Sequence, residues 1–89
     1  MRTMEFVSGM VVISSAGHDD GVWFVVTGAD GRYVYIADGK ERRLASPKKK
    51  NIKHIRRTLH TISTDGLTDK KLRRTLNALS AQSIAEESE

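Results

Sequence analysis

Residues 9–37 consist of short runs of β-branched and aromatic residues that are separated by glycine and aspartate. This pattern is typical of β-strands joined by tight turns, and it predicts strands over residues 10–14, 22–27 and 32–37. Asp30-Gly31 lies between the last two of these strands, and glycine supplies the positive φ that a tight hairpin turn needs. The chain is therefore expected to fold around a β-sheet that contains a hairpin.

Two more strands are expected beyond residue 37. Asp38-Gly39 turns the chain again, and residues 41–45 fit a short fourth strand that ends before the single proline, Pro47. Residues 52–62 are ambiguous, because their apolar residues fit the spacing of a helix and, in part, the alternation of a strand. We favour a strand through about Leu59, because Thr, Ile and His populate strands readily and a sheet that closes on itself needs a last strand.

A helical pattern lies near the C-terminus. Leu72, Leu76 and Leu79 recur at i, i+4 and i+7, with lysine and arginine between them. This spacing predicts an amphipathic helix, for which Thr68 or Asp69 is the expected N-cap.

Positive charge is concentrated in one stretch of a chain whose net charge is +4. Residues 40–57 contain nine lysines and arginines and a single acid, Glu41. Such a segment favours a polyanionic partner, although a lysine run can also be a solvated loop that serves solubility. Nine bases in one short region favour the polyanion.

Composition excludes several classes of protein. The chain has no cysteine, so neither a disulfide framework nor a thiolate metal site is available, which fits a cytoplasmic protein. No apolar run approaches the length of a signal-peptide core or a membrane span, so we expect neither secretion nor membrane insertion. With 89 residues, the chain can build one small core.

Residues 9–26 resemble the KOW motif of translation and transcription proteins, which is a strand, a polar loop ending in glycine, and a second strand. Beyond this motif, the chain is similar to small bacterial KOW-domain RNA-binding proteins that resemble a large-subunit ribosomal protein of archaea and eukaryotes. The blocks that match in order and spacing are Tyr35-Ile36-Ala37-Asp38-Gly39, Arg42-Arg43-Leu44, Pro47-Lys48-Lys49-Lys50 and Lys53-His54. The resemblance covers residues 9–59, and the helix around residues 67–79 also resembles the end of those proteins.

The expected fold is accordingly mainly β: a small SH3-like (KOW) barrel of about five strands with a C-terminal amphipathic helix. We expect residues 1–62 to form the barrel domain, residues 63–82 a linker and the helix, and residues 83–89 a disordered acidic tail. Whether the helix packs on the barrel or on a partner stays open.

The resemblance implies an RNA-binding protein with a translation-related role, whose partners are ribosomal or other structured RNA and could include the ribosome or ribosomal proteins. Phosphate contacts are expected from the basic residues that match the family pattern or lie beside it. These are Arg42, Arg43, Lys48, Lys49, Lys50, Lys53, Arg56 and Arg57.

The loop before Gly21 departs from the resemblance. Relatives usually carry lysine or arginine there, whereas this chain has His18, Asp19 and Asp20, and phosphate repels carboxylates. We therefore expect this loop to point away from RNA. Gly21 itself is expected to be structural, because a tight loop needs a residue that tolerates positive φ and close backbone approach.

The remaining residues offer weaker functional signals. Tyr33 and Tyr35 are expected to pack in the core or at its rim, with stacking on unpaired bases as the alternative. Asp38 and Gly39 are expected to be structural.

The histidines lack metal-ligand spacing, and no nucleophile–base pair or phosphate-binding loop is recognisable, so we expect no metal, no cofactor, no small-molecule substrate and no catalysis. The alternatives to RNA binding are an SH3-like protein-binding module and a DNA-binding protein.

Overall fold

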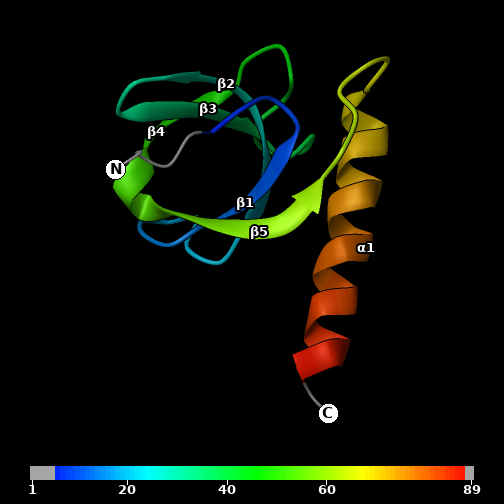
Figure 1. Cartoon of the computed structure of the whole chain (residues 1–89). Helices are drawn as coiled ribbons and strands as arrows, with labels where there is room; N and C mark the ends of the chain where they lie inside the picture. The colour runs from blue at the N-terminus through cyan, green and yellow to red at the C-terminus, as the bar shows by residue number, and fades with distance from the viewer. Residues whose placement is uncertain (1–5, 88–89) are drawn as a thin grey trace.

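Five antiparallel strands and one long helix make up the part of the chain, residues 6–87, that the computed structural model describes (Figure 1). The strands form a single sheet with the spatial order β4-β3-β2-β1-β5. The elements in chain order are β1 (Met10–Ser14), β2 (Trp23–Asp30), β3 (Tyr33–Ala37), β4 (Lys48–Asn51), the 3-10 helix η1 (Ile52–His54), β5 (Ile55–Thr61) and α1 (Asp69–Glu87).

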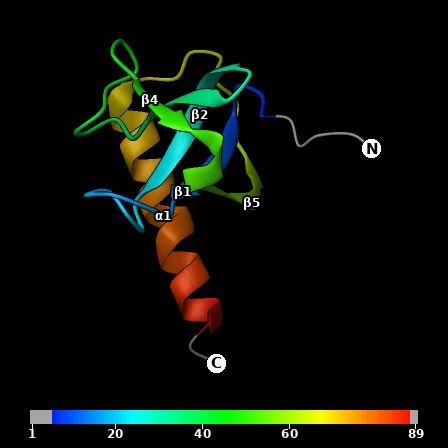
Figure 2. The same cartoon turned by 90° about the vertical axis from the view of Figure 1, so that its left-hand side faces the viewer.

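The sheet is strongly bent, so that it encloses a core as a small barrel does (Figures 1 and 2). Two irregularities in strand register accompany the bend: one in β2 between Val26 and Gly28, and one where β1 pairs with β5. Bulges of this kind increase local twist and bend the strand that carries them. The predicted mainly β, barrel-like fold with about five strands and a C-terminal helix is confirmed.

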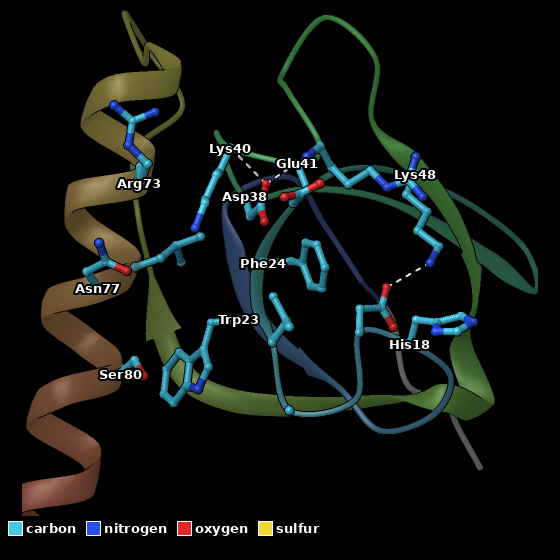
Figure 3. A pocket seen from close by; sticks show the side chains of 15 residues that line it. His18, Trp23, Phe24, Asp38, Lys40, Glu41, Lys48, Arg73, Asn77 and Ser80 are labelled. Atoms are coloured by element: carbon cyan, nitrogen blue, oxygen red, sulfur yellow. Dashed lines mark hydrogen bonds and ion pairs between the residues drawn. The ribbon is translucent and has the colours of Figure 1, made fainter.

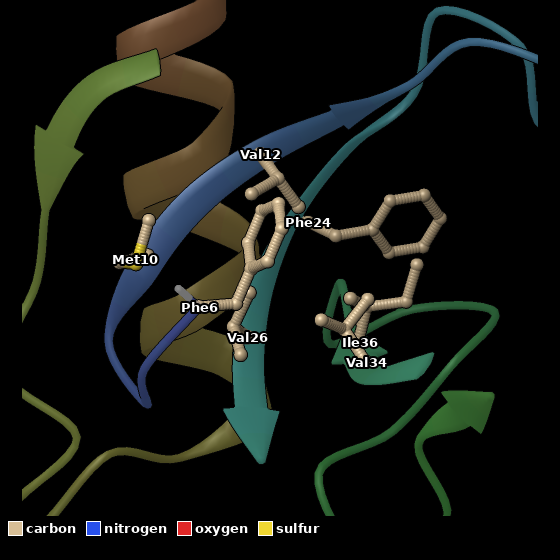
Figure 4. Close-up of a cluster of buried hydrophobic side chains, with 7 residues drawn as sticks. All are labelled: Phe6, Met10, Val12, Phe24, Val26, Val34 and Ile36. Carbon is tan, nitrogen blue, oxygen red and sulfur yellow. The ribbon is translucent and has the colours of Figure 1, made fainter. Parts of the chain in front are cut away.

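The central strands are buried on both faces. One cluster fills the barrel interior (Figure 4) and contains Phe6, Met10, Val12, Phe24, Val26, Val34 and Ile36. Val11 and Val25 point to the opposite face, where they contact Leu72 and Leu76 of α1. This double burial explains why the sequence shows continuous apolar runs here, because strands covered on both sides cannot alternate with polar residues.

Helix α1 therefore packs on the barrel, a point that the sequence left open. Its first turn is capped as expected, since the Thr68 hydroxyl accepts a hydrogen bond from the backbone N–H of Lys71 at 3.2 Å. The Asp69 carboxylate accepts a hydrogen bond from the backbone N–H of Leu44 at 2.8 Å, which ties the loop between β3 and β4 to the start of α1.

The expected end of the helix is wrong. Helix α1 continues to Glu87, whereas the sequence indicated a disordered tail from residue 83. Alanine, glutamine and glutamate are good helix formers, and they dominate residues 81–87. Residues 88 and 89 of the expected tail lie outside the described residues.

The expected fourth strand is also wrong. Residues 41–45 form an irregular loop of bends and a turn, and the edge strand is instead the lysine run, β4. The Asp38 carboxylate accepts hydrogen bonds from the backbone N–H groups of Lys40 and Arg42, so these two donors are satisfied within the loop and need no partner strand. Lys48–Asn51 then pairs with β3 in place of residues 41–45.

The other boundaries differ by a few residues. Strand β2 extends to Asp30, which confines the turn of the predicted hairpin to Gly31 and Arg32. The ambiguous segment resolves into η1 followed by β5, so a strand is present, but it begins only at Ile55 and ends at Thr61, two residues beyond the expected Leu59.

Candidate nucleic-acid interface

The register of β4 divides the basic residues into two groups. Lys48 and Lys50 lie opposite Ile36 and Val34, whose side chains are in the barrel interior. Because neighbouring residues of a strand point to opposite faces, Lys49 projects to the outside. The lysine run is therefore a strand in which Lys48 and Lys50 share one face and Lys49 lies on the other.

Lys48 and Lys50 are bound by the loop that precedes β2. The Lys48 ammonium lies 2.8 Å from Asp19 Oδ2, and the Lys50 ammonium lies 2.9 Å from Asp19 Oδ1. Lys50 also donates to the carbonyl oxygen of Ala16 at 2.8 Å, and its side chain is 10% exposed. Figure 3 shows Lys48 reaching toward this loop beside His18. Because Asp19 binds both ammonium groups and their side chains are 27% and 10% exposed, these two lysines are poorly placed for phosphate.

A third group completes the Asp19 site. The Ser14 hydroxyl, which is buried, donates to Asp19 Oδ1 at 2.7 Å. Burial alone would raise the pKa of the Asp19 carboxyl, but hydrogen bonds from Lys48, Lys50 and Ser14 outweigh it and hold the pKa well below its ordinary range. Asp19 is thus a structural anion, in contrast to its exposed neighbour Asp20.

The depressed pKa of Asp19 predicts a specific acid sensitivity. The folded state binds this proton less tightly than the unfolded chain, whose aspartate pKa is about 3.9, so the stabilisation is present at neutral pH and is lost as the pH falls below that value. Unfolding midpoints measured from pH 7 to pH 2 should fall more steeply for the wild type than for Asp19→Asn. Parallel curves would show that Asp19 contributes nothing to the acid transition.

The other six predicted phosphate-binding residues are exposed, and none forms an ion pair within the part of the chain that the structure describes. They are Arg42, Arg43, Lys49, Lys53, Arg56 and Arg57. Four of them follow one another through β4, η1 and β5, and Arg42 and Arg43 lie in the loop before β4. Six of the eight predicted positions therefore carry exposed positive charge, and Lys48 and Lys50 do not.

Tyr33 and Tyr35 lie on the outer face of β3, beside Lys49. Both are half-buried, and neither belongs to the two buried clusters. The Lys49 ammonium sits 4.4 Å from the centre of the Tyr33 ring, and Gly28, opposite Tyr35, places no side chain over that ring. The two tyrosines are thus rim residues beside a cation, an arrangement that suits stacking as well as surface packing.

The predicted structural residues have separate roles. Gly21 has the expected positive φ of 89°, but nothing lies within 4 Å of where a Cβ would be, so close approach is not its reason. Gly39 combines both constraints: its φ is 79°, and a Cβ there would collide with the backbone carbonyl of Asp69. Asp38 and Gly39 together fix the loop that carries Arg42 against the start of α1.

The sequence did not predict a groove that lies between the loop joining β3 to β4, the loop that carries Asp19, and helix α1 (Figure 3). It encloses about 680 Å³, and Trp23, Lys40, Arg42 and Arg73 are among its lining residues. Arg73 donates to the carbonyl oxygen of Gly39 at 3.0 Å, which joins two of its walls. Three segments distant in sequence contribute to the groove, so no local motif could indicate it.

No protein-family model matches the chain, and no curated protein is significantly similar to it. The resemblance to KOW-domain proteins therefore stays a prediction. Within residues 6–87, no helix is long and apolar enough to cross a membrane. Among the same residues, no group of three or more histidine, aspartate or glutamate side chains is placed to hold a metal ion.

Proposed function

We propose that the protein binds structured RNA, ribosomal RNA above all, in a translation-related role in the cytoplasm. The observation that carries the proposal is that the six cations from the loop before β4 through β5 are exposed and that none of them forms an ion pair among the described residues. Phosphate contacts by such residues supply most of the affinity of nucleic-acid binding and orient the protein on its target. The family resemblance supports RNA, and ribosomal RNA, as the partner.

Base contacts in this proposal come from the outer face of β3. Tyr33 and Tyr35 would stack on unpaired bases while Lys49 neutralises a nearby phosphate. Lys48 and Lys50 do not belong to the proposed interface, because Asp19 binds both.

The proposal predicts that RNA affinity depends on the cations of β4, η1 and β5 rather than on total charge. Changing Lys53, Arg56 and Arg57 to alanine should weaken binding across RNA sequences and flatten the slope of log affinity against log salt, by about 0.7–0.9 for each phosphate that the variant no longer neutralises. Fluorescence anisotropy with a labelled ribosomal RNA fragment at several salt concentrations measures both quantities.

The matched control removes the same charge elsewhere. Lys70, Lys71 and Arg74 are exposed on α1, so their triple alanine variant also loses three positive charges. We expect this variant to retain most of the affinity and slope. Equal losses in the two variants would indicate attraction by net charge without a defined interface. A DNA fragment of the same sequence tests whether the ribose 2′-hydroxyl contributes, and crosslinking in cells identifies the RNA.

The groove at α1 favours peptide binding as the second candidate function. SH3-like barrels recognise peptides at aromatic rims, and Trp23 supplies an aromatic wall here. Selection from a displayed peptide library tests this function. A consensus peptide whose binding is abolished by Asn77→Arg, on the helical wall of the groove, would support it, and failure to enrich any sequence would exclude it.

A further inference from the structure

Strand β5 contains a bulge that is held by specific hydrogen bonds. Met10 of β1 pairs with Thr61, and Val12 pairs with Arg57, so β5 advances four residues where β1 advances two. The Thr58 hydroxyl donates to the carbonyl oxygen of Val11 at 2.7 Å and accepts the backbone N–H of His60 at 3.1 Å. The same hydroxyl thus anchors the bulge to β1 and closes it.

The bulge presents Leu59 fully to solvent. The relative exposure of Leu59 is 101%, against 58% for Val7 and 37% for Val22, the other large apolar residues exposed on the described surface. Single apolar residues are common on protein surfaces and usually need no explanation. Leu59 differs because a built bulge projects it, and because it contributes no burial to the fold.

The surroundings of Leu59 indicate the chemistry of its partner. Residues 53–60 contain two arginines, one lysine and two histidines, and no acid. Arg56 and Arg57 are exposed on the same strand, which forms one edge of the sheet. A bulge at an edge interrupts the row of free backbone groups that an added strand would need, so a partner strand fits poorly. A polyanion with apolar surface fits well.

We propose that Leu59 is an apolar anchor for an unpaired nucleotide of the bound RNA. Arg56 and Arg57, which point to opposite faces of β5, bind phosphates of an RNA strand that passes over this edge, and Leu59 packs against the exposed face of the base or its sugar. Unpaired bases in loops and bulges present such faces, and apolar side chains pack against unstacked base steps in other complexes. The inference rests on the proposed RNA binding and names the structural class of RNA that this surface selects.

The test compares Leu59→Ala with the wild type on two RNA probes: a labelled stem-loop with an unpaired loop, and a blunt duplex of equal length. We expect affinity for the stem-loop to fall about three- to tenfold, as for the removal of an apolar contact of this size, with an unchanged salt slope because no charge is removed. Affinity for the duplex should not change. The thermal midpoint should also stay constant, since the side chain is fully exposed.

Two further variants sharpen the result. Val7→Ala removes a different exposed apolar side chain and should bind like the wild type. Leu59→Met keeps an apolar side chain of similar volume and should restore most of the affinity.

Several outcomes would overturn the inference. If Leu59→Ala binds the stem-loop normally while the Lys53, Arg56 and Arg57 variant loses affinity, Leu59 is no anchor but RNA binding stands. An equal loss on duplex and stem-loop would refute selection of unpaired nucleotides. Wild-type binding to polyglutamate as tight as to RNA would point to an acidic protein partner. Absence of RNA binding by the wild type would refute the proposed function itself.

Discussion

Asp19→Ala should lower the free energy of unfolding by about 2–3 kcal/mol. The change leaves the Lys50 ammonium, 10% exposed, without a carboxylate, and it removes the shorter of the two hydrogen bonds that the buried Ser14 hydroxyl donates. Breaking a buried ion pair costs about 3–5 kcal/mol, and the exposure of Lys48, 27%, reduces the expected value. Urea unfolding followed by circular dichroism measures the difference.

Asp20→Ala is the matched control for this prediction. Asp20 is exposed, and within the described residues it takes part in neither ion pair, so its loss should change stability by less than about 0.5 kcal/mol. Combining Asp19→Ala with Lys50→Met should recover part of the loss, because an apolar residue of similar volume leaves no buried charge. Equal stability of Asp19→Ala and Asp20→Ala would show that the ion pairs contribute nothing.

Leu72→Ala should destabilise the protein by about 2–5 kcal/mol, the range for truncating a buried leucine. Leu72 is fully buried against Val11, Val25 and Ala37, so its removal opens a cavity between α1 and the sheet. The same urea experiment measures this effect. Arg74→Ala, on the exposed side of the helix, should leave stability nearly unchanged. If the two variants match, α1 is an appendage and its packing does not contribute to the fold.

Local pattern was sufficient to place β1, β2, β3 and the start of α1, because these elements show clear short-range periodicity. Residues 10–14 and the leucines of α1 were placed correctly for this reason. The prediction of a strand over residues 41–45 was wrong because the alternation there is weak. The conformation of this loop depends instead on the carboxylates of Asp38 and Asp69, which accept hydrogen bonds from its backbone. Lysines have low strand propensity, so tertiary pairing with β3 overrode the local preference of Lys48–Asn51.

The basic surface was predictable in composition but not in detail. Charge counting treats Lys48, Lys49 and Lys50 alike, and it treats Asp19 and Asp20 as two equal surface acids. The register of β4 and the path of the preceding loop decide which of them meet, and both depend on contacts about 30 residues apart in sequence. Leu59 was missed because its exposure results from a bulge that sequence alternation cannot show.

The pairing of β1 with β5 has a consequence for how the chain reaches its folded state. Val12 lies opposite Phe24 on one side and Arg57 on the other, so one neighbour is local and the second is distant in sequence. The hairpin of β1 and β2 can form early, but its apolar faces stay uncovered until β5 and α1 arrive. Closing so long a loop costs chain entropy before any contact compensates for it, which slows folding. During synthesis, the hairpin of β1 and β2 therefore leaves the ribosome before β5 and α1. Until those elements are made, the apolar faces of the hairpin are exposed and prone to misassociation.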